Sequence, residues 1–373
     1  MRPHKQDFSL PDGTYLLSHS VGCLPRAARG AADRFFEQWG AQGGEAWEGW
    51  LASVGDFQKS LATLLNGEAA EFCPQTNISS AIAKILSSLP RRKGKTKLLL
   101  SELDFPSAGF ALAQAERAGY AVEFMPAESD AVSPECWLRH ITHDTQLVLV
   151  THVLYGNSGL NPVAEIISAA RRHDVFTVVD VAQSAGVVPI DLREWDADFV
   201  VGSAVKWLCG GPGAGFLWAN PSGVERFEPT DVGWFSHEDP FEFRIRSFRY
   251  APDARRFWGG TPSVLPYVVA RAGIDLVNSV GVANVRAHNR TLTERLVRAA
   301  LERGLTVRTP HDPARRGGTV CVAFRDPQRV YRRLKEERVF VDVRPSYGVR
   351  FSPHVYNDAE DIDRAVATFE AAA

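Results

Sequence analysis

Between about residues 60 and 220, short apolar runs alternate with stretches in which apolar positions recur at helical spacing. Most of these runs are continuously apolar, which is typical of strands covered on both faces of a sheet. The runs that we predict to be strands are Lys97–Ser101, Ala121–Met125, Gln146–Thr151, Phe176–Asp180, Phe199–Ser203 and Gly215–Trp218. Strands that alternate with helices form βαβ units, so the pattern predicts an α/β fold with a mainly parallel sheet.

Polar residues followed by proline mark the beginnings of two predicted helices. Asn161 and Pro162 precede VAEIISAARRH, and Ser133 and Pro134 precede ECWLRHI. We expect the polar side chains to cap these helices and the prolines to occupy the first helical position. A further helix is expected over Ser80–Leu89.

The region after the predicted sheet has a different character. Residues 244–266 are rich in arginine, aromatic residues, glycine and proline, and two helical stretches begin near Pro266 and Asn284. Beyond them LTVRTP, GTVCVAF and VFVDV predict strands, and Pro327–Glu337 and Asp358–Ala371 predict helices. A chain of 373 residues suits a large domain with a smaller companion. We therefore predict an amino-terminal segment (1–45) that contributes to the substrate site and the small domain, a large domain (46–262) and a small α+β domain (263–373).

Composition excludes several classes of protein. The 42 basic and 44 acidic side chains give a formal charge of −2, so the chain lacks the basic excess of a nucleic-acid-binding protein. The sequence shows no apolar core of a signal peptide and no apolar run long enough to span a membrane, so the expected location is cytoplasmic. Five widely separated cysteines form no CxxC pair, which argues against a disulfide framework or a metal site and favours buried thiols.

The segment most informative about chemistry pairs an aspartate with a lysine. Asp180 ends one predicted strand, and Lys206 follows 26 positions later, three residues past the end of another. In an open α/β sheet, ligands bind at the carboxyl ends of the strands, so both side chains are expected in one crevice. Pyridoxal 5'-phosphate (PLP) requires this pair: a carboxylate that keeps its pyridine nitrogen protonated and a lysine that bonds to its aldehyde. Of eight lysines, only Lys206 lies between a buried strand and a glycine-rich turn, Gly210–Gly213.

Motifs along most of the chain add a family resemblance. Residues 155–218, with VPIDLREWDADFVVG, KWL and GGPGAGFLW, resemble the class V aminotransferase superfamily, which is PLP-dependent, and within it the kynureninases. YLLSHSVGCLP, DFPSAGF, VGWFSH, FWGGTPSV and VRFSPHVYNDAEDID are similar to further kynureninase segments, in the same order. The resemblance implies an aspartate-aminotransferase-like fold with a mainly parallel large-domain sheet and a small α+β domain, and it implies a homodimer with shared active sites.

The resemblance also implies roles for individual residues. Lys206 would form the Schiff base with PLP, and Asp180 would pair with the pyridinium nitrogen. Phe105 would stack on the ring, and Gln183 would hydrogen-bond to the ring hydroxyl. The remaining cofactor residues would be Gln75, Thr76, Ser203, Trp234 and, from the neighbouring subunit, Thr261. Arg350 would bind the substrate carboxylate as a fork. The rest of the substrate pocket would be lined by His19, Ser20, His152 and Asn157.

Departures from the kynureninase pattern bear on the reaction. This chain has Gln183 where kynureninases have histidine, Val205 where they have tyrosine, and Ala108 where they have aspartate. Cysteine desulfurases need a cysteine before the carboxyl-terminal arginine, and RPSYGVRFSPH contains none. We therefore expect a kynureninase-like lyase of secondary metabolism that acts on an α-amino acid and cleaves a Cβ–S or Cβ–C bond through a carbanion at Cα. The alternatives are an aminotransferase, a decarboxylating oxidative deaminase, a genuine kynureninase, and a PLP-binding protein without catalysis.

Overall fold

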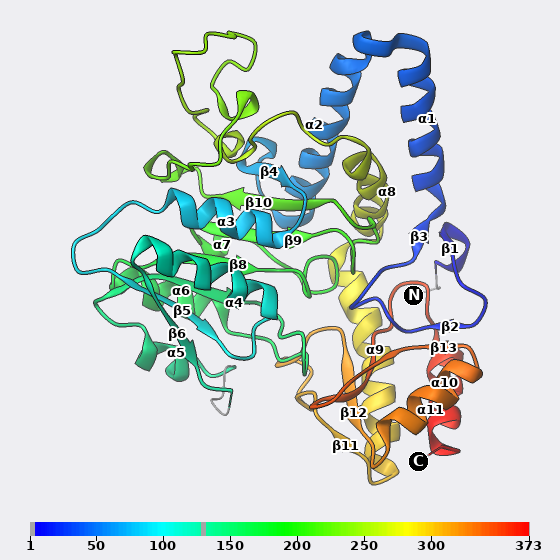
Figure 1. The fold of residues 1–373 in the computed structure, drawn as a ribbon. Helices are drawn as coiled ribbons and strands as arrows, with labels where there is room; N and C mark the ends of the chain where they lie inside the picture. Colours follow the sequence, from blue (N-terminus) through cyan, green and yellow to red (C-terminus); the bar gives the residue numbers. More distant parts are fainter. Residues whose placement is uncertain (1–3, 128–131, 373) are drawn as a thin grey trace.

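A large twisted sheet organises the amino-terminal two-thirds of the chain (Figure 1). The structure is a computed structural model and describes residues 4–127 and 132–372, so the outermost residues of the predicted segments 1–45 and 263–373 lie outside it. Within the described residues seven strands follow the order β4-β10-β9-β8-β7-β5-β6. They are β4 (Phe72–Gln75), β5 (Lys97–Ser101), β6 (Ala121–Met125), β7 (Thr145–Thr151), β8 (Phe176–Asp180), β9 (Phe199–Ser203) and β10 (Gly215–Ala219).

The structure confirms the predicted α/β sheet and adds one strand. The six predicted strands are present to within one residue at each end. β10 runs antiparallel to both of its neighbours, and the other pairs of adjacent strands are parallel. The additional strand, β4, is short and contains Pro74, which is why its sequence gives no clear strand signal. It lies at the edge of the sheet and pairs only with β10 among the described strands.

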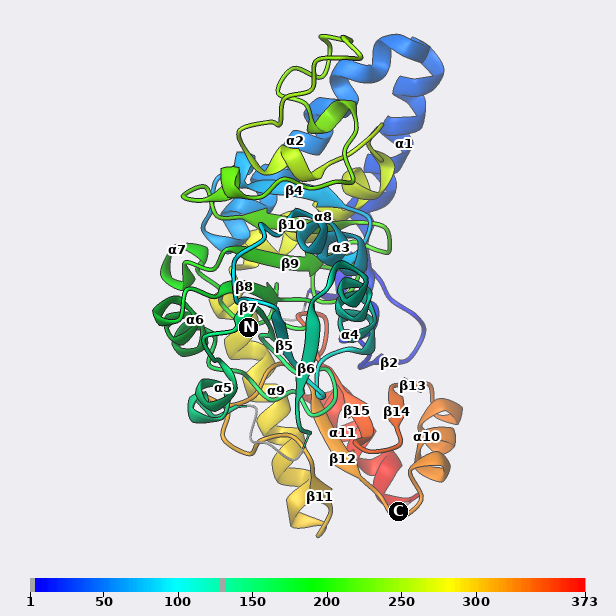
Figure 2. The same ribbon diagram turned by 60° about the vertical axis from the view of Figure 1, so that its left-hand side comes forward.

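Alternate residues of the strands face two separate hydrophobic layers. Val148, Val150 and Val179 belong to one buried cluster, whereas Leu149 and Val178 belong to the other. α3 (Ile78–Ser88) and α4 (Pro106–Ala113) cover the second layer. The opposite face is covered by α5 (Pro134–His140), α6 (Val163–Arg172) and α7 (Leu192–Trp195), as Figure 2 shows. Because both faces are covered, β5, β7, β8, β9 and β10 are buried along nearly their whole length, whereas the edge strand β6 is partly exposed.

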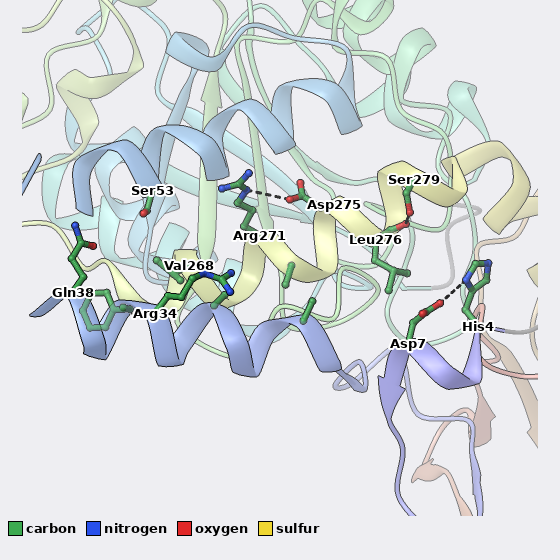
Figure 3. Close-up of a pocket in the computed structure, with 14 residues that line it drawn as sticks. His4, Asp7, Arg34, Gln38, Ser53, Val268, Arg271, Asp275, Leu276 and Ser279 are labelled. Carbon is green, nitrogen blue, oxygen red and sulfur yellow. Dashed lines mark hydrogen bonds and ion pairs between the residues drawn. The ribbon is translucent and has the colours of Figure 1, made fainter. Parts of the chain in front are cut away.

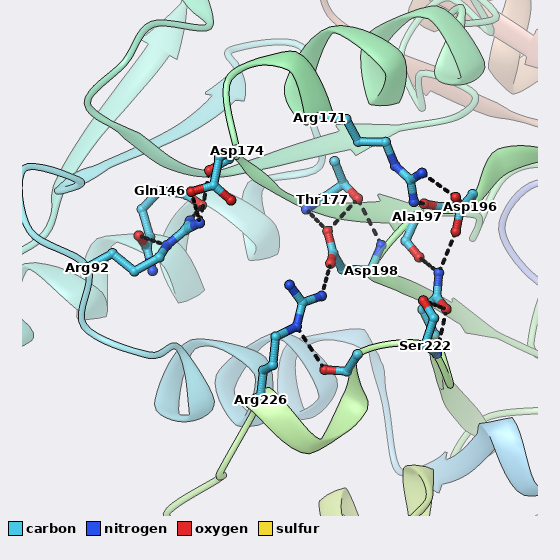
Figure 4. Close-up of polar contacts among 12 residues, drawn as sticks. Arg92, Gln146, Arg171, Asp174, Thr177, Asp196, Ala197, Asp198, Ser222 and Arg226 are labelled. Atoms are coloured by element: carbon cyan, nitrogen blue, oxygen red, sulfur yellow. Dashed lines mark hydrogen bonds and ion pairs between the residues drawn. The ribbon is translucent and has the colours of Figure 1, made fainter.

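Polar contacts close the edge of the sheet at which β7, β8 and β9 begin (Figure 4). The carboxylate of Asp198 accepts from the N–H and hydroxyl of Thr177 (2.9 and 3.1 Å) and lies 3.3 Å from Arg226. Arg92 donates to the side chain and to the carbonyl of Gln146, both at 2.9 Å. The opposite edge, formed by the carboxyl ends of the parallel strands, remains for ligands.

A hairpin of two helices packs beside the sheet. α1 (Arg26–Gln42) and α2 (Trp47–Leu65) both contact α8 (Leu265–Val280). Figure 1 shows the hairpin projecting from one end of the molecule. Tyr267 and Ile274 of α8 belong to the same buried cluster as the sheet and α2.

The carboxyl-terminal region has a core of its own. α9 (Val282–Glu302) leads from the large core into a sheet whose order, within the described residues, is β11-β12-β15-β14. The remaining elements are β11 (Thr306–Val307), β12 (Val320–Ala323), α10 (Pro327–Glu336), β13 (Val339–Phe340), β14 (Asp342–Arg344), β15 (Gly348–Phe351) and α11 (Ala359–Glu370). Val285 packs in the large core and Leu292 in the small one, so the two cores separate within α9. The predicted boundary at 262/263 therefore lies before α8, in a region that still packs on the large core.

The amino-terminal segment joins the small domain. β2 (Thr14–Tyr15) pairs in parallel with β13, and Leu16 belongs to the core of the small domain. β1 (Phe8–Ser9) and β3 (Leu24–Pro25) pair with each other. Residues 10–23 therefore lie beside both the small domain and the sheet.

The predicted helix caps need correction. α6 begins at Val163 with Pro162 as its N-cap, and the buried Asn161 side chain donates instead to the carbonyl of Thr151 (2.6 Å). Ser133 does precede α5, but its hydroxyl bonds to Glu135 rather than to the helix backbone. α3 begins at Ile78, where Asn77 accepts from the N–H of Ser80 (2.9 Å). Only Asn161 therefore bonds to another element, the strand β7, whereas Ser133 and Asn77 each bond to a residue in the first turn of the helix that follows.

All five cysteines are buried and none is disulfide-bonded. Among the described helices, none alone combines the length and apolarity needed to cross a membrane. α8 and α9 meet that requirement only when taken together, and they are bent by 82° where they join.

Candidate active site

The carboxyl ends of neighbouring strands bring the predicted polar residues to one edge of the sheet. Thr151 lies opposite Asp180 in the β7–β8 pair. Ser203 and Gln75 lie on either side of Gly215, which begins the antiparallel β10. Asp180, Ser203 and Gln75 therefore occupy the same edge, as the strand pattern predicted for Asp180 and Ser203.

Lys206, Asp180 and Phe105 meet at this edge. The Lys206 amine lies 5.7 Å from the centre of the Phe105 ring and close enough to Asp180 for their charges to interact. Burial lowers the pKa of Lys206; the charge of Asp180 raises it, and that of Arg350 lowers it further. Burial raises the pKa of Asp180, against the hydrogen bond from Ala182 and the charge of Lys206. Asp180 is only 4% exposed, whereas Lys206 as a whole residue is half-buried.

Two glycines let other segments pack against the turn that carries Lys206. A Cβ at Gly22 would lie 2.2 Å from the carbonyl oxygen of Lys206, and the Gly22 N–H donates to Val205 (2.8 Å). A Cβ at Gly273 of α8 would lie 2.0 Å from the carbonyl oxygen of Leu208. The amino-terminal segment and α8 therefore fix the backbone on both sides of the lysine.

Arg350 lies beside this centre and is already paired. Its Nε and Nη2 donate to the two carboxylate oxygens of Asp342 (2.8 and 2.5 Å), and Nη1 donates to the carbonyl of Tyr155 (2.6 Å). His19 also contacts Asp342, with Nε2 at 3.1 Å from Oδ1. The structure thus brings together the predicted Arg350 and His19 and adds Asp342, which the sequence reasoning missed. The available signal was the strand pattern, since Asp342 and Arg350 are cross-strand partners on β14 and β15.

Two tyrosines extend the site and were also missed. The Tyr155 ring meets the Phe105 ring edge-on with centroids 5.2 Å apart, and Tyr347 lies 6.2 Å from Tyr155. A Cβ at Gly156 would lie 2.2 Å from the Tyr347 ring, so glycine is needed there for the tyrosine to approach. The rings of Phe105, Tyr155 and Tyr347 therefore form a row that begins beside Lys206 and ends at the turn between β14 and β15.

Gln183, Ser20 and Asn157 lie around this centre. The Gln183 amide donates to the carbonyl of His19 (3.1 Å) and accepts from the Trp207 indole (3.4 Å). Ser20 is partly exposed and lies two residues before Gly22, which touches the lysine turn. The Asn157 side chain accepts from the Gly159 N–H (2.9 Å), and this hydrogen bond closes a local turn just after Tyr155.

The structure does not bring the other predicted residues into contact with Lys206. The buried His152 ring meets Trp195 edge-on at 4.7 Å, and burial, with the charge of Arg286, lowers its pKa to about 3. Trp234 belongs to an aromatic cluster with Trp47, Phe235, Phe241 and Phe243. Thr261 is exposed after Gly259, and Thr76 is exposed beside Ser80 at the start of α3.

Asp104 is a second buried carboxyl beside the site. It precedes Phe105 and accepts from the Ser101 N–H (2.8 Å). Burial raises the pKa of Asp104 to about 7, and the charge of Asp180 acts in the same direction. Asp104 is the first residue of DFPSAGF, the motif from which a role was predicted for Phe105 alone.

Asp104→Asn should make the cofactor-free protein more stable as the pH rises. The folded carboxyl keeps its proton above its ordinary pKa of 3.8, so ionising it costs stability between pH 3.8 and about 7. Asparagine keeps the acceptor for Ser101 and cannot ionise. We expect the gain in unfolding free energy over wild type to grow by on the order of 3 kcal/mol between pH 4.5 and 7.5. Urea denaturation at both pH values measures it, with the exposed Asp33→Asn as control; an equal gain at both would contradict the assignment.

A cavity of about 730 Å³ lies elsewhere, between α1, α2 and α8 (Figure 3). Its polar lining includes Arg34, Gln38 and Arg271, and Arg271 pairs with Asp275 (3.1 Å). None of the residues assembled around Lys206 lines it. The candidate active site is therefore distinct from this cavity.

Comparison with known proteins gives a consistent result. The profile of the family described as aminotransferase class-V matches residues 15–365. A kynureninase of Deinococcus radiodurans is 32% identical over 380 residues, which cover 98% of this chain and 91% of that protein. YcbU of Bacillus subtilis, described as an uncharacterized aminotransferase, is 29% identical over 87% of this chain and 85% of its own length. A solved structure of a C-DES mutant, with glycine covalently linked to the PLP cofactor, has a TM-score of 0.91 at 22% identity, with 100% of both chains covered.

Proposed function

The chain belongs to the aminotransferase class-V family and is a PLP-dependent enzyme, and from that premise we propose that it is a kynureninase-like lyase acting on an α-amino acid. The bond that it breaks is Cβ–S or Cβ–C. The observation that carries the proposal is the meeting of Lys206, Asp180 and the Phe105 ring at the carboxyl edge of the sheet. Bound PLP supplies an electron-accepting ring that stabilises negative charge at the substrate Cα.

Asp180 fits the pyridine nitrogen of PLP. Its Oδ1 accepts the N–H of Ala182 (2.8 Å), and Oδ2 has no hydrogen bond within the described part of the chain. A buried carboxylate with a free oxygen is suited to accept the N–H of a protonated pyridine. Phe105 offers its ring face for stacking and Gln183 an amide for the ring hydroxyl.

Lys206 has the properties of a nucleophile and a base. Because its pKa is lowered by burial, a larger fraction of its amine is neutral at pH 7 than for an exposed lysine. A neutral amine is the form that bonds to an aldehyde and that accepts a proton from the substrate Cα. Packing of Gly22 and Gly273 against the turn limits the directions in which the amine can move.

The start of α3 is the proposed phosphate site. Free backbone N–H groups at the beginning of a helix favour an anion, and the hydroxyls of Thr76 and Ser203 add donors at the same edge. Gln75 also lies there, although its amide already donates to Phe257 (3.0 Å). Thr261, exposed in one chain, is proposed to reach the phosphate of the neighbouring subunit.

A homodimer is part of the proposal. Phe241, Phe243 and Ile245 are 57%, 74% and 99% exposed on the loop that follows Trp234. A second copy that covers this loop would remove their apolar surface from water. Trp234 would then belong to the interface that completes the neighbouring site. A mass near twice 41.1 kDa in light scattering supports this part, and a mass near 41.1 kDa contradicts it.

The state of Cys321, which lies opposite Arg350 in the β12–β15 pair, disfavours a reaction that uses an enzyme thiol. Cys321 donates to the carbonyl of Gly156 (3.1 Å), and burial raises its pKa to about 12. A thiol with that pKa provides almost no thiolate at pH 7. The proposed leaving group therefore departs from the substrate Cβ without attack by an enzyme thiol.

An aminotransferase is the second candidate. The similarity to YcbU favours it, as do Gln183, Val205 and Ala108, which replace residues of the kynureninase pattern. The products of the reaction also distinguish a decarboxylating oxidative deaminase and a genuine kynureninase from the proposed lyase.

The reaction is tested by supplying the PLP-loaded protein with S-substituted L-cysteines and with L-kynurenine. The proposed lyase consumes water and an S-substituted cysteine and releases a thiol, pyruvate and ammonia in equal amounts. Alanine from kynurenine would assign the protein to the kynureninases. Amino transfer to an added keto acid would favour the aminotransferase, and oxygen uptake with loss of CO₂ the deaminase. Lys206→Ala serves as the blank for each assay.

A further inference from the structure

A buried line of hydrogen bonds ends at Arg350. The Thr319 hydroxyl lies 2.8 Å from the Ser352 hydroxyl, which lies 2.6 Å from His19 Nδ1. His19 Nε2 lies 3.1 Å from Asp342 Oδ1, and Asp342 holds Arg350 through both of its oxygens. The line joins the amino-terminal segment to β14 and β15, and Arg350 is only 3% exposed.

The charges along this line can be assigned. Burial lowers the pKa of His19 to about 4, against the hydrogen bond to Asp342, so the ring is neutral at pH 7. Although burial opposes it, hydrogen bonds from His19 and Arg350 keep the pKa of Asp342 below its usual range. Because a carboxylate only accepts, His19 Nε2 carries the proton and Nδ1 accepts from Ser352. Asp342 is therefore an anion held by His19 and by Arg350, and the exposed Arg344 also lies 3.2 Å from its Oδ2.

Arg350 keeps donors for a ligand. A guanidinium has five N–H groups. Asp342 takes one on Nε and one on Nη2, and the Tyr155 carbonyl takes one on Nη1. One N–H on each terminal nitrogen remains, which is the number that the two oxygens of a carboxylate require.

We propose that Asp342, oriented by His19, is the positioning residue that fixes the Arg350 guanidinium to receive the α-carboxylate of the substrate. The proposal rests on the proposed function, since it assumes that Arg350 binds that carboxylate. Arginine has several rotatable bonds, and an unpaired guanidinium in this buried place would turn toward other carbonyls. The two bonds to Asp342 remove that freedom before the substrate arrives.

The test compares ligands that differ only in the carboxylate. L-alanine and L-alaninamide are titrated into the PLP-loaded protein, and dissociation constants are read from the change in visible absorbance. We expect Asp342→Asn to weaken L-alanine binding at least about tenfold and L-alaninamide binding less than about threefold. Asparagine keeps the shape but turns an N–H donor toward the arginine. His19→Gln should show a smaller loss of the same kind, which keeps the test open if Asp342→Asn unfolds.

A matched control is available on the surface. Asp363 forms the same two-oxygen fork with Arg295 (2.6 Å for both bonds) but is exposed, so Asp363→Asn should leave both constants unchanged. If Asp342→Asn binds L-alanine as wild type does, or more tightly, the positioning role is overturned. Arg350→Ala separates the two claims. If it removes the preference for acid over amide while Asp342→Asn retains it, only this inference fails; if Arg350→Ala retains the preference, the proposed carboxylate site fails.

Discussion

Lys206→Ala should lower turnover by at least about a thousandfold and leave the purified protein colourless once free PLP is removed. The variant lacks the amine that bonds to the cofactor and the base that takes the Cα proton. Loss of either function is costly, because both act on the same bond-breaking step. Visible absorbance after gel filtration, together with the assays described above, measures both effects.

Another buried lysine provides the control for this substitution. Lys97 begins β5 at the opposite edge of the sheet, where its amine donates to His140 (2.9 Å) and Thr142 (2.6 Å). Lys97→Ala should keep the colour and the activity, although it costs stability. If borohydride still attaches PLP to the Lys206→Ala chain in amounts equal to wild type, another amine holds the cofactor and the assignment of Lys206 is wrong.

Cofactor-free protein should lose stability steeply as the pH falls from 6.5 toward 4, because three histidines are buried in the neutral form. Burial lowers the pKa of His19 and of His354 to about 4 and that of His152 to about 3. Their ordinary value is 6.5, so below that pH the unfolded chain binds protons that the folded chain cannot. Averaged over this window, each histidine contributes about 1 kcal/mol per pH unit. Asp104, Asp180 and Asp198, whose pKa values are raised, act in the opposite sense, so the net loss is below about 3 kcal/mol per pH unit.

His152→Phe isolates one of these contributions. The His152 ring packs edge-on against Trp195, and its buried Nδ1 has no hydrogen-bond partner among the described residues. Phenylalanine keeps an aromatic ring there and cannot be protonated. The slope of unfolding free energy against pH between 5 and 6.5, measured with urea, should fall by about 1.1 kcal/mol per pH unit. His143→Phe, at an exposed position, should leave the slope unchanged; an unchanged slope in His152→Phe means that this histidine is not held neutral by burial.

Several site residues could be predicted because they depend on local patterns. Asp180 and Ser203 end apolar strands, and the carboxyl ends of parallel strands meet at one edge whatever the rest of the chain does. Lys206 follows one of these strands by three residues and therefore had to lie near the same edge. The order of motifs added Phe105, Gln183 and Arg350, whose surroundings in the fold agree with a site around Lys206.

Other features depend on contacts between distant parts of the chain. β4 joins the edge of the sheet through backbone pairing with β10, which lies far along the chain. α8 packs on the large core although it follows the predicted domain boundary. His152 and Trp234 have the residue types of a ligand pocket, yet their neighbours are Trp195 and a separate aromatic cluster. A residue type at a strand end does not reveal which face of the sheet its side chain takes.

By itself, then, the sequence determined the α/β sheet and the edge at which Asp180 and Lys206 lie near each other, because hydrophobic periodicity and strand direction can be read from short segments. Only the tertiary structure decided that His19 would reach Asp342 across 323 positions, and that Asp342 would already hold Arg350. Such contacts form only when the amino-terminal segment packs beside the small domain. A local sequence pattern does not specify contacts between segments so far apart in the chain.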